Sequence, residues 1–176
     1  KNELAVTMLF KILMGDEEPD EGTVKWGVST TQAYFPKDHN SYFENCDYDL
    51  IDWMRQFSTD KRESYLRTFL GRMLFSGDDV YKQVKVLSGG EKVRCMISKM
   101  MLSGANFLVF DQPTNHLDLI YQKQIFALIG QWLQKPGRAV VSVVHDLSLA
   151  RAFGTDALLM DSGRKIALGR ANDVLT

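Results

Sequence analysis

Two apolar segments separated by one amphipathic pattern constrain the fold of this sequence most. The first segment is NFLVFD, which ends at Asp111, and the second is RAVVSVVHD, which contains His145. Between them, YQKQIFALIGQWLQ places its large apolar side chains on one face of a helix, and Pro136 and Gly137 end that helix. This strand-helix-strand order predicts parallel strands, so Asp111 and His145 should reach the same edge of a sheet.

Length and composition place the chain among single globular domains. Its 176 residues are 45% hydrophobic, which suffices for one buried core. Lys and Arg (21) nearly balance Asp and Glu (22), so the formal charge of -1 indicates no strong field that would attract nucleic acid or an acidic membrane. Cys46 and Cys95 lack metal-ligand spacing, and no apolar run is long enough to span a bilayer. We therefore expect a soluble cytoplasmic protein without direct membrane insertion.

The chain divides by pattern into three stretches. Residues 1–46 contain a short helix, Thr7–Met14, that ends at Gly15, and a strand pair in TVKWGVSTTQAYF. Residues 47–103 have a helical period, clearest in DLIDWMRQF and RESYLRTFLGRMLF. Residues 104–176 alternate between strands and helices, and we expect them to form a mostly parallel α/β sheet.

The motif LSGGE, at Leu87 to Glu91, begins a helix and could bind an anion. Gly89 and Gly90 let a phosphate approach the backbone, and the Ser88 hydroxyl can donate a hydrogen bond. The free amides of a helix start favour negative charge. The alternative is an ordinary capping box, in which Ser88 caps the helix and Glu91 returns the bond. Taken alone, the motif leaves these two interpretations about equal.

Asp111 and His145 are the other candidates for chemistry. A carboxylate at the end of a buried strand can hold Mg²⁺ through water, as in nucleotide-hydrolysing proteins. The plain alternatives are a helix-capping acid at an exposed strand end and a structural histidine. The order LSGGE, strand with Asp111, NHLD, strand with His145 argues against chance.

In this order the motifs resemble those of the ATP-binding cassette (ABC) ATPase domain, over nearly the whole chain. The resemblance implies an α/β fold of the P-loop NTPase type, with a mostly parallel sheet and a helical signature subdomain. LSGGE resembles the signature motif, which contacts the γ-phosphate of a nucleotide held by a second cassette. The resemblance assigns this contact to Ser88, Gly89, Gly90 and Glu91. VFDQP resembles the Walker B motif with Asp111 on the magnesium side, NHLD resembles the D-loop ending in Asp118, and His145 resembles the switch histidine. ATP, Mg²⁺ and a second cassette, in the same or another chain, are the implied cofactors and partner.

Gln112 stands where the resemblance implies a catalytic glutamate that polarises the attacking water. Glutamine keeps the size and a hydrogen-bonding oxygen but has no basicity near neutral pH, so hydrolysis should be slow. One explanation is a deliberate Glu-to-Gln change that traps a closed, nucleotide-bound state, and the intact surroundings favour it. The other is a naturally degenerate site. Both lead to an ABC-type ATPase that is deficient in hydrolysis.

The phosphate loop, G-x-x-x-x-G-K-[ST] in the family, departs further. Its residues align with KNELAVTM, which places Ala5 at the final glycine, Val6 at the phosphate lysine and Thr7 at the magnesium threonine. Lys37 takes the place of the glutamine expected after YFP; its ammonium could reach a phosphate but cannot coordinate Mg²⁺. The plain alternatives are an N-terminal turn and a solvated loop lysine. The first glycine and the preceding strands would lie before Lys1, so we expect residues 1–46 to be a remnant of the nucleotide-binding core with truncated N-terminal strands and phosphate loop.

The resemblance differs between two parts of the chain. Residues 1–119 resemble the second cassette of ABC-F proteins, soluble factors that act on ribosomes. Residues 120–176, with HDLSLA and GRANDVLT, are more similar to the ATPase subunits of metal-chelate and vitamin importers. A chimera and one divergent protein both remain open. We favour an ABC-F-like, ribosome-associated translation factor; the alternatives are an importer ATPase acting on a transporter membrane subunit, and a non-catalytic cassette that serves a partner's nucleotide site.

Overall fold

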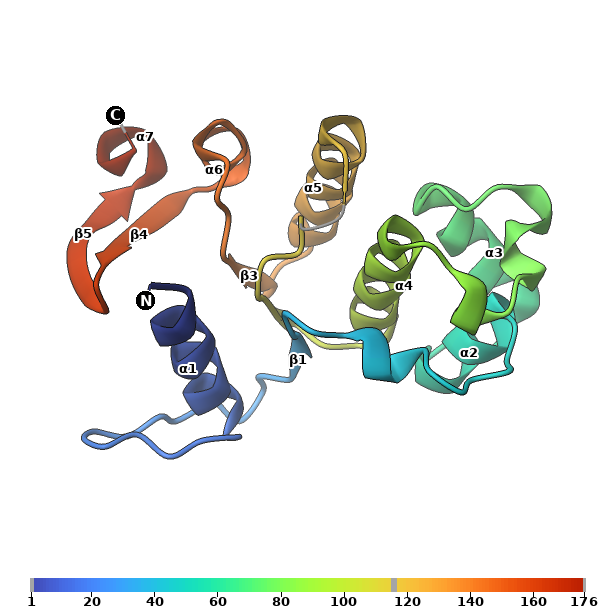
Figure 1. Ribbon diagram of the computed structural model, residues 1–176, viewed down its shortest axis with the longest axis horizontal. Coiled ribbons are helices and arrows are strands. Elements are labelled where there is room, and N and C mark those ends of the chain that lie inside the picture. Colours follow the sequence, from blue (N-terminus) through green and yellow to red (C-terminus); the bar gives the residue numbers. More distant parts are fainter. Residues whose placement is uncertain (1, 115–116, 176) are drawn as a thin grey trace.

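The computed structural model describes residues 2–114 and 117–175 (Figure 1). In chain order, its helices, strands and 3-10 turns are α1 (Asn2–Met14), β1 (Gln32–Phe35), η1 (Asn40–Tyr42), α2 (Leu50–Phe57), α3 (Glu63–Arg72), η2 (Gly77–Tyr81), η3 (Val84–Val86), α4 (Gly89–Leu102), β2 (Phe107–Phe110), α5 (Leu119–Leu133), β3 (Ala139–Ser142), α6 (Leu147–Phe153), β4 (Asp156–Asp161), β5 (Arg164–Arg170) and α7 (Ala171–Val174).

Three short parallel strands in the order β1-β2-β3 form the central sheet. In its register Ala33 lies beside Leu108, and Leu108 lies beside Val140. β2 is the middle strand, and Leu108 to Phe110 are fully buried, which accounts for its continuous apolar sequence. The α/β class and the parallel sheet predicted from the sequence are confirmed.

One expected strand pair is wrong, and a second, in DALLMD and KIALG, is confirmed as a hairpin. The strand pair predicted in residues 23–35 is one strand, β1, preceded by a loop. Trp26 donates its indole N–H to the Leu13 carbonyl of α1 at 2.9 Å, so this loop packs on a helix instead of pairing with β1. The last two strands stay outside the parallel sheet. β4 and β5 form an antiparallel hairpin because Ser162 and Gly163, both at positive φ, connect them directly.

The N-terminal helix α1 begins at Asn2, before the predicted start at Thr7, so the stretch expected as a loop or turn is helical. The helix ends where the sequence predicts, at Gly15. This residue adopts φ 82°, and its amide donates to the Ile12 carbonyl at 3.2 Å. The next amide, of Asp16, donates to the Lys11 carbonyl at 2.9 Å. This pair of bonds is a Schellman motif, which ends the helix and turns the chain into the loop of residues 16–31.

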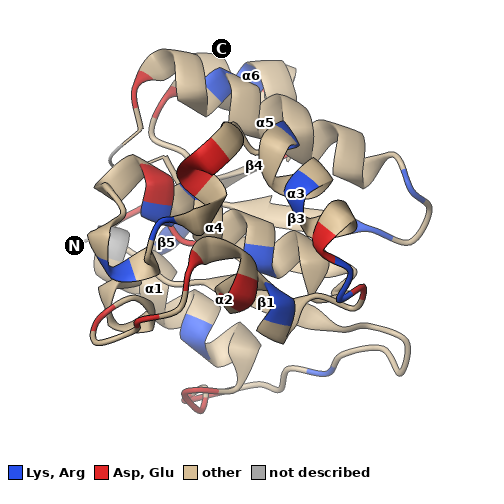
Figure 2. Ribbon diagram, turned by 90° about the vertical axis from the view of Figure 1, so that its right-hand side faces the viewer, with Lys and Arg blue, Asp and Glu red and all other residues tan. Residues whose placement is uncertain are grey.

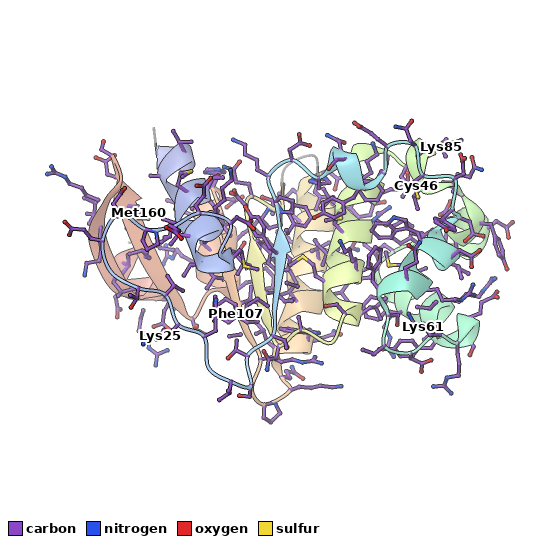
Figure 3. The ribbon with its side chains drawn as sticks, turned by 90° about the horizontal axis from the view of Figure 1, so that it is seen from below. Lys25, Cys46, Lys61, Lys85, Phe107 and Met160 are labelled. Carbon is purple, nitrogen blue, oxygen red and sulfur yellow. The ribbon has the colours of Figure 1, made fainter. Side chains whose placement is uncertain are left out.

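Contacts near both ends hold α1 in place. The loop that follows it is fixed to the sheet by Trp26, whose ring lies 4.9 Å from the Phe107 ring between centroids. Figure 3 labels Phe107 on the sheet and Lys25, the neighbour of Trp26, on this loop. At the other end the hairpin turn approaches α1, since a Cβ placed on Gly163 would lie 3.7 Å from the Cβ of Ala5.

Helices α2, α3 and α4 form a helical region on one side of the sheet, at the right of Figure 1. Its interior is apolar: Leu66, Leu70 and Met96 are fully buried. The Phe43 and Trp53 rings stack there with centroids 5.3 Å apart. These side chains belong to one continuous core that also contains Leu108 and Phe110 of β2, so the helical region is packed directly on the sheet.

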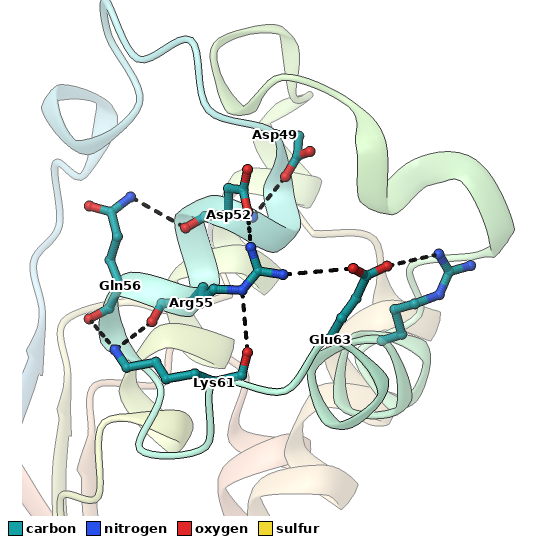
Figure 4. A network of polar contacts seen from close by, with 7 residues as sticks. Asp49, Asp52, Arg55, Gln56, Lys61 and Glu63 are labelled. Atoms are coloured by element: carbon teal, nitrogen blue, oxygen red, sulfur yellow. Dashed lines mark hydrogen bonds and ion pairs between the residues drawn. The ribbon is translucent and has the colours of Figure 1, made fainter.

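A network of polar contacts joins α2 to α3 on the surface of this region (Figure 4). Asp49 caps α2 by accepting a hydrogen bond from the Asp52 amide at 2.7 Å. The Arg55 guanidinium pairs with Asp52 and lies 3.8 Å from a Glu63 oxygen. It also donates to the Lys61 carbonyl at 3.3 Å. Because these groups are exposed, each ion pair contributes at most about 1 kcal/mol, and the network mainly orders the loop between the helices.

Charged residues of both signs are mixed on the surface. Figure 2 shows Lys and Arg segments interspersed with Asp and Glu segments on the side that it presents. This distribution agrees with the formal charge of -1. Among the helices that the structure describes, none is long and apolar enough to cross a bilayer.

Candidate functional site

The end of strand β2 brings two predicted site residues into contact. Asp111 is fully buried, and its amide donates to the Phe35 carbonyl of β1 at 3.0 Å. The Thr7 hydroxyl, from α1, donates to Asp111 Oδ2 at 2.7 Å. The threonine and the carboxylate that were both expected to hold magnesium are therefore neighbours, although 104 residues separate them in the sequence.

Tyr34, on β1, is the third member of this cluster. Burial raises the pKa of its phenol to about 12, and the negative charge of Asp111, which also hydrogen-bonds with the phenol, adds to the rise. A phenolate here would lie next to a carboxylate in a partly desolvated place. Tyr34 therefore remains a neutral hydrogen-bond partner of Asp111 throughout the neutral pH range.

We expect Tyr34 to make the fold sensitive to alkaline pH. A folded-state pKa raised from 10.0 to about 12 contributes stability that is complete below pH 10 and is lost as the pH rises toward 12. In a tyrosinate absorbance titration, Tyr34→Phe should remove a component near pH 12, and urea unfolding should depend less on pH between 10 and 12. An unchanged alkaline limb of the titration would contradict the placement of Tyr34 beside Asp111.

The cluster has the oxygen groups that a magnesium nucleotide needs. Asp111 Oδ1 is buried and has no hydrogen-bond partner among residues 2–114 and 117–175. In the described part of the chain, no three His, Cys, Asp or Glu side chains gather into a metal site. Mg²⁺ is commonly held by one or two protein oxygens, with substrate phosphates and water completing its shell. Asp111 and Thr7 are therefore better suited to a metal ion that arrives bound to a phosphate ligand than to a metal ion that is permanently resident in the protein.

A cavity of about 640 Å³ opens beside this cluster. Thr7 and Tyr34 form part of its wall, so the cavity reaches the residue that donates to Asp111 and the phenol whose pKa Asp111 raises. Its volume is in the range of small-molecule and cofactor sites. The remaining wall comes from the end of α1, the loop after β1, and η1: Lys11, Asp16, Pro36, Lys37, Asp38, Asn40 and Tyr42.

Only some of the residues aligned with the phosphate loop and with the expected glutamine line this cavity. Thr7 and Lys37 line it. Ala5 and Val6 do not belong to its described wall. Ala5 instead faces the hairpin turn at Gly163. Thr7 is therefore the loop-aligned residue that the structure brings to the Asp111 cluster.

Gln112 and His145 follow the adjacent parallel strands β2 and β3, so His145 lies at the same edge of the sheet as Asp111, as predicted for these two residues. Gln112 is 5% exposed and adopts φ 57°, a left-handed conformation that costs a residue with a side chain on the order of 1 kcal/mol. Beyond β3, the Val143 amide donates to the Phe110 carbonyl at 2.9 Å, which extends the strand pairing toward His145. His145 is exposed and precedes Asp146, the residue that caps α6.

The LSGGE segment has the geometry of a capping box. Ser88 Oγ accepts from the Glu91 amide at 3.3 Å, and Glu91 Oε2 accepts from the Ser88 amide at 2.8 Å. Burial alone would raise the pKa of Glu91, but hydrogen bonds from Ser88 and Lys82 outweigh this effect and lower it. Gly89 and Gly90 form the first turn of α4, where backbone amides have no partner within the helix. The local capping interpretation is correct, and it leaves the glycine amides at the helix start.

The signature-like segment and Asp118 lie outside the wall of the cavity. The segment is connected to that wall, since Lys92 Nζ donates to Asn40 Oδ1 at 3.4 Å. Asp118 caps α5 by accepting from the Tyr121 amide at 3.1 Å. It lines a second cavity of about 450 Å³, shared with residues that follow α3. Asn115 and His116 of NHLD lie outside the described residues.

Lys11 and Tyr34 are site residues that the sequence prediction missed. Lys11 follows Thr7 by four residues, and residues at i and i+4 share a helix face. That spacing was the available signal for Lys11. Tyr34 carried no comparable signal, because the four residues of β1 are too few and too similar in burial for alternation to reveal which side chain faces a site.

The architecture and the strand-end cluster define an ABC-type ATPase fold. The chain superposes on the crystal structure of the archaeal ribosome recycling factor aABCE1 in complex with the ribosomal stalk protein aP1 with a TM-score of 0.78. The match covers 96% of this chain and 33% of that chain at 22% identity, a level that concerns the fold alone.

The chain belongs to the ABC transporter family, whose sequence model matches residues 6–115. It is 68% identical over 120 residues to YkpA of Bacillus subtilis (strain 168), an uncharacterized ABC transporter ATP-binding protein; this covers 68% of the chain and 22% of YkpA. It is 30% identical over 145 residues to ABC transporter F family member 2 of Arabidopsis thaliana, which covers 82% of the chain and 21% of that protein. The chain thus spans about a fifth of the length of these relatives.

Proposed function

We propose that this chain is an ATP-binding cassette that binds Mg-ATP in the 640 Å³ cavity and couples binding to a conformational change. The observation that carries the proposal is the 2.7 Å contact between Thr7 and the buried Asp111, at the wall of that cavity. These two groups would hold Mg²⁺ while Lys37 contacts phosphate. In this role the metal, when bound, neutralises phosphate charge, and the protein groups orient the phosphate chain.

Hydrolysis would be slow in this cassette. Gln112 offers an amide where a carboxylate would take up a proton from water, so the residue can orient water but cannot act as a base. His145, on the neighbouring strand end, would serve as the switch histidine. Val6 and Gln112 together favour the alternative of a non-catalytic cassette whose role is to complete a partner's nucleotide site.

The second cassette is the proposed partner at the start of α4. Ser88 and Gly89 are exposed there, and the first-turn amides of the helix favour an anion. We assign Ser88, Gly89, Gly90 and Glu91 to contact with a nucleotide held by that cassette, and Asp118 to the D-loop beside it. On this view residues 1–46 and 104–176 belong to the nucleotide-binding core, and residues 47–103 present the signature motif.

An ABC-F-like, ribosome-associated role in the cytoplasm is our preferred setting. It is supported by the resemblance of residues 1–119 to ABC-F cassettes and by the likeness to a plant F-family protein. The importer-like segments HDLSLA and GRANDVLT support the alternative role of a transporter ATPase subunit. A chimera of the two kinds of cassette remains part of the proposal.

Binding of Mg-ATP to the isolated chain tests this function. We expect weak binding, with a dissociation constant of about 1 mM, because position 6 carries no charge. Val6→Lys should tighten binding about tenfold by adding a charge-assisted contact, whereas Val6→Met, a control of similar length without charge, should not. Isothermal titration at millimolar nucleotide, with and without Mg²⁺, measures both effects. Micromolar binding by the unaltered chain would contradict a disabled phosphate loop, and absence of binding would favour the non-catalytic cassette.

A further inference from the structure

The cavity beside Asp111 contains a cation to which the phosphate-loop alignment gives no role. Lys11 lies in the last turn of α1, four residues after Thr7, and both side chains line the cavity. Since i and i+4 side chains share one helix face, the Lys11 ammonium and the Thr7 hydroxyl project toward the same space. Within residues 2–114 and 117–175, Lys11 forms no ion pair.

The end of α1 fixes the position of Lys11. Its carbonyl accepts the Asp16 amide at 2.9 Å, and Gly15 at φ 82° turns the chain away from the helix axis. Thr7 is fixed in turn by its 2.7 Å hydrogen bond to Asp111. The same helix therefore presents a hydroxyl at the metal-binding carboxylate and a cation one turn further along the cavity.

We propose that Lys11 supplies the positive charge that Val6 cannot, so that the cavity recognises the phosphate chain of a magnesium-bound polyphosphate. The inference rests on the proposed nucleotide site and assigns to it a residue outside the phosphate-loop pattern. Val6 lies outside the described wall of the cavity, whereas Lys11 forms part of it. A lysine ammonium is a compact charge on a flexible stem, which suits contact with a phosphate oxygen without a fixed geometry.

The other charges of the cavity wall decide which form of the ligand it suits. Asp16 and Asp38 line the cavity together with Lys11 and Lys37, so the wall has two cations and two carboxylates. A bare polyphosphate would gain from the lysines but would be repelled by both carboxylates. A magnesium complex carries less negative charge and can use Asp111 Oδ1, which accepts no hydrogen bond from the described residues, so it is the favoured form.

The test is an amide chemical-shift titration of the chain with Mg-ATP and, separately, with magnesium tripolyphosphate. Lys11→Ala should lower the affinity for both ligands about tenfold, because it removes a charge-assisted contact to phosphate. Lys11→Arg should keep most of the affinity. Lys123→Ala removes an exposed lysine of α5 that lies outside the cavity wall, and it should leave both affinities unchanged. Lys11→Gln, which keeps a polar stem on α1, repeats the test if the alanine variant loses the native spectrum.

The possible outcomes separate this inference from the function on which it rests. Suppose that the unaltered chain binds Mg-ATP and that Thr7→Val weakens this binding. If Lys11→Ala then leaves the binding unchanged, the inference is overturned and the nucleotide site stands. If Lys11→Ala affects ATP but not tripolyphosphate, Lys11 contacts the nucleoside and the inference is again overturned. If the unaltered chain binds neither ligand, both proposals fail. Equal losses with both ligands support Lys11 as the phosphate cation.

Discussion

Replacing Gln112 with glutamate is expected to raise the rate of phosphate release from Mg-ATP by about 10²-fold or more, the usual contribution of a general base. Gln112 follows directly on Asp111 and is 5% exposed, so a carboxylate there would lie close to the proposed magnesium position in a largely dry environment. Steady-state phosphate release, measured at protein concentrations high enough for two chains to pair, gives the rate.

The same substitution, Gln112→Glu, should weaken the fold when nucleotide is absent. The introduced side chain would be a second carboxylate beside Asp111, buried without a metal and held at φ 57°. Gln112→Ala is the matched control, because it removes the amide without adding a base, and it should leave the rate near that of the unaltered chain. Equal rates for the glutamine and glutamate forms would show that position 112 does not limit hydrolysis.

The parts of the fold that could be predicted from the sequence are those with a strong period. β2 was predictable because its apolar run leads into an acid, and α5 because Ile125, Ile129 and Trp132 repeat on one face; all three side chains are buried. The loop of residues 16–31 was mistaken in part for a strand because it also carries β-branched and aromatic residues. There the tertiary contacts of Trp26 with Leu13 and Phe107 outweigh local propensity.

The candidate site was predictable where a residue stands at a strand end. Parallel topology alone places Asp111 and His145 at one edge. The contact between Thr7 and Asp111 agrees with the family alignment but could not follow from spacing, because it depends on how α1 packs against the sheet. Lys11 and Tyr34 enter the site through that same packing. The left-handed backbone of Gln112 has no sequence signal, since glutamine does not favour that conformation.

Asp111→Asn should raise the stability of the free chain and remove the extra stability that the ligand provides. In the absence of nucleotide, Asp111 is a fully buried carboxylate, and one of its oxygens has no hydrogen-bond partner in the described part of the chain. Its neutral isostere should therefore raise the free energy of unfolding by about 1–2 kcal/mol. Asparagine can still accept the hydrogen bond from Thr7, so the local geometry should persist. Asp78→Asn, at an exposed acid of η2, is the control and should leave stability nearly unchanged.

With Mg-ATP the difference in stability between the two chains should shrink or disappear. A ligand at ten times its dissociation constant stabilises the protein that binds it by about 1.4 kcal/mol, and the Asp78→Asn control should gain this amount as the unaltered chain does. Asp111→Asn should gain almost nothing, because the amide cannot replace a carboxylate ligand of Mg²⁺. Urea unfolding at several Mg-ATP concentrations measures the difference. If Mg-ATP stabilises the Asp111→Asn chain as much as the unaltered chain, the metal binds elsewhere. If the variant is more stable without Mg-ATP but is not stabilised by it, the fold keeps a costly buried charge because the ligand requires it.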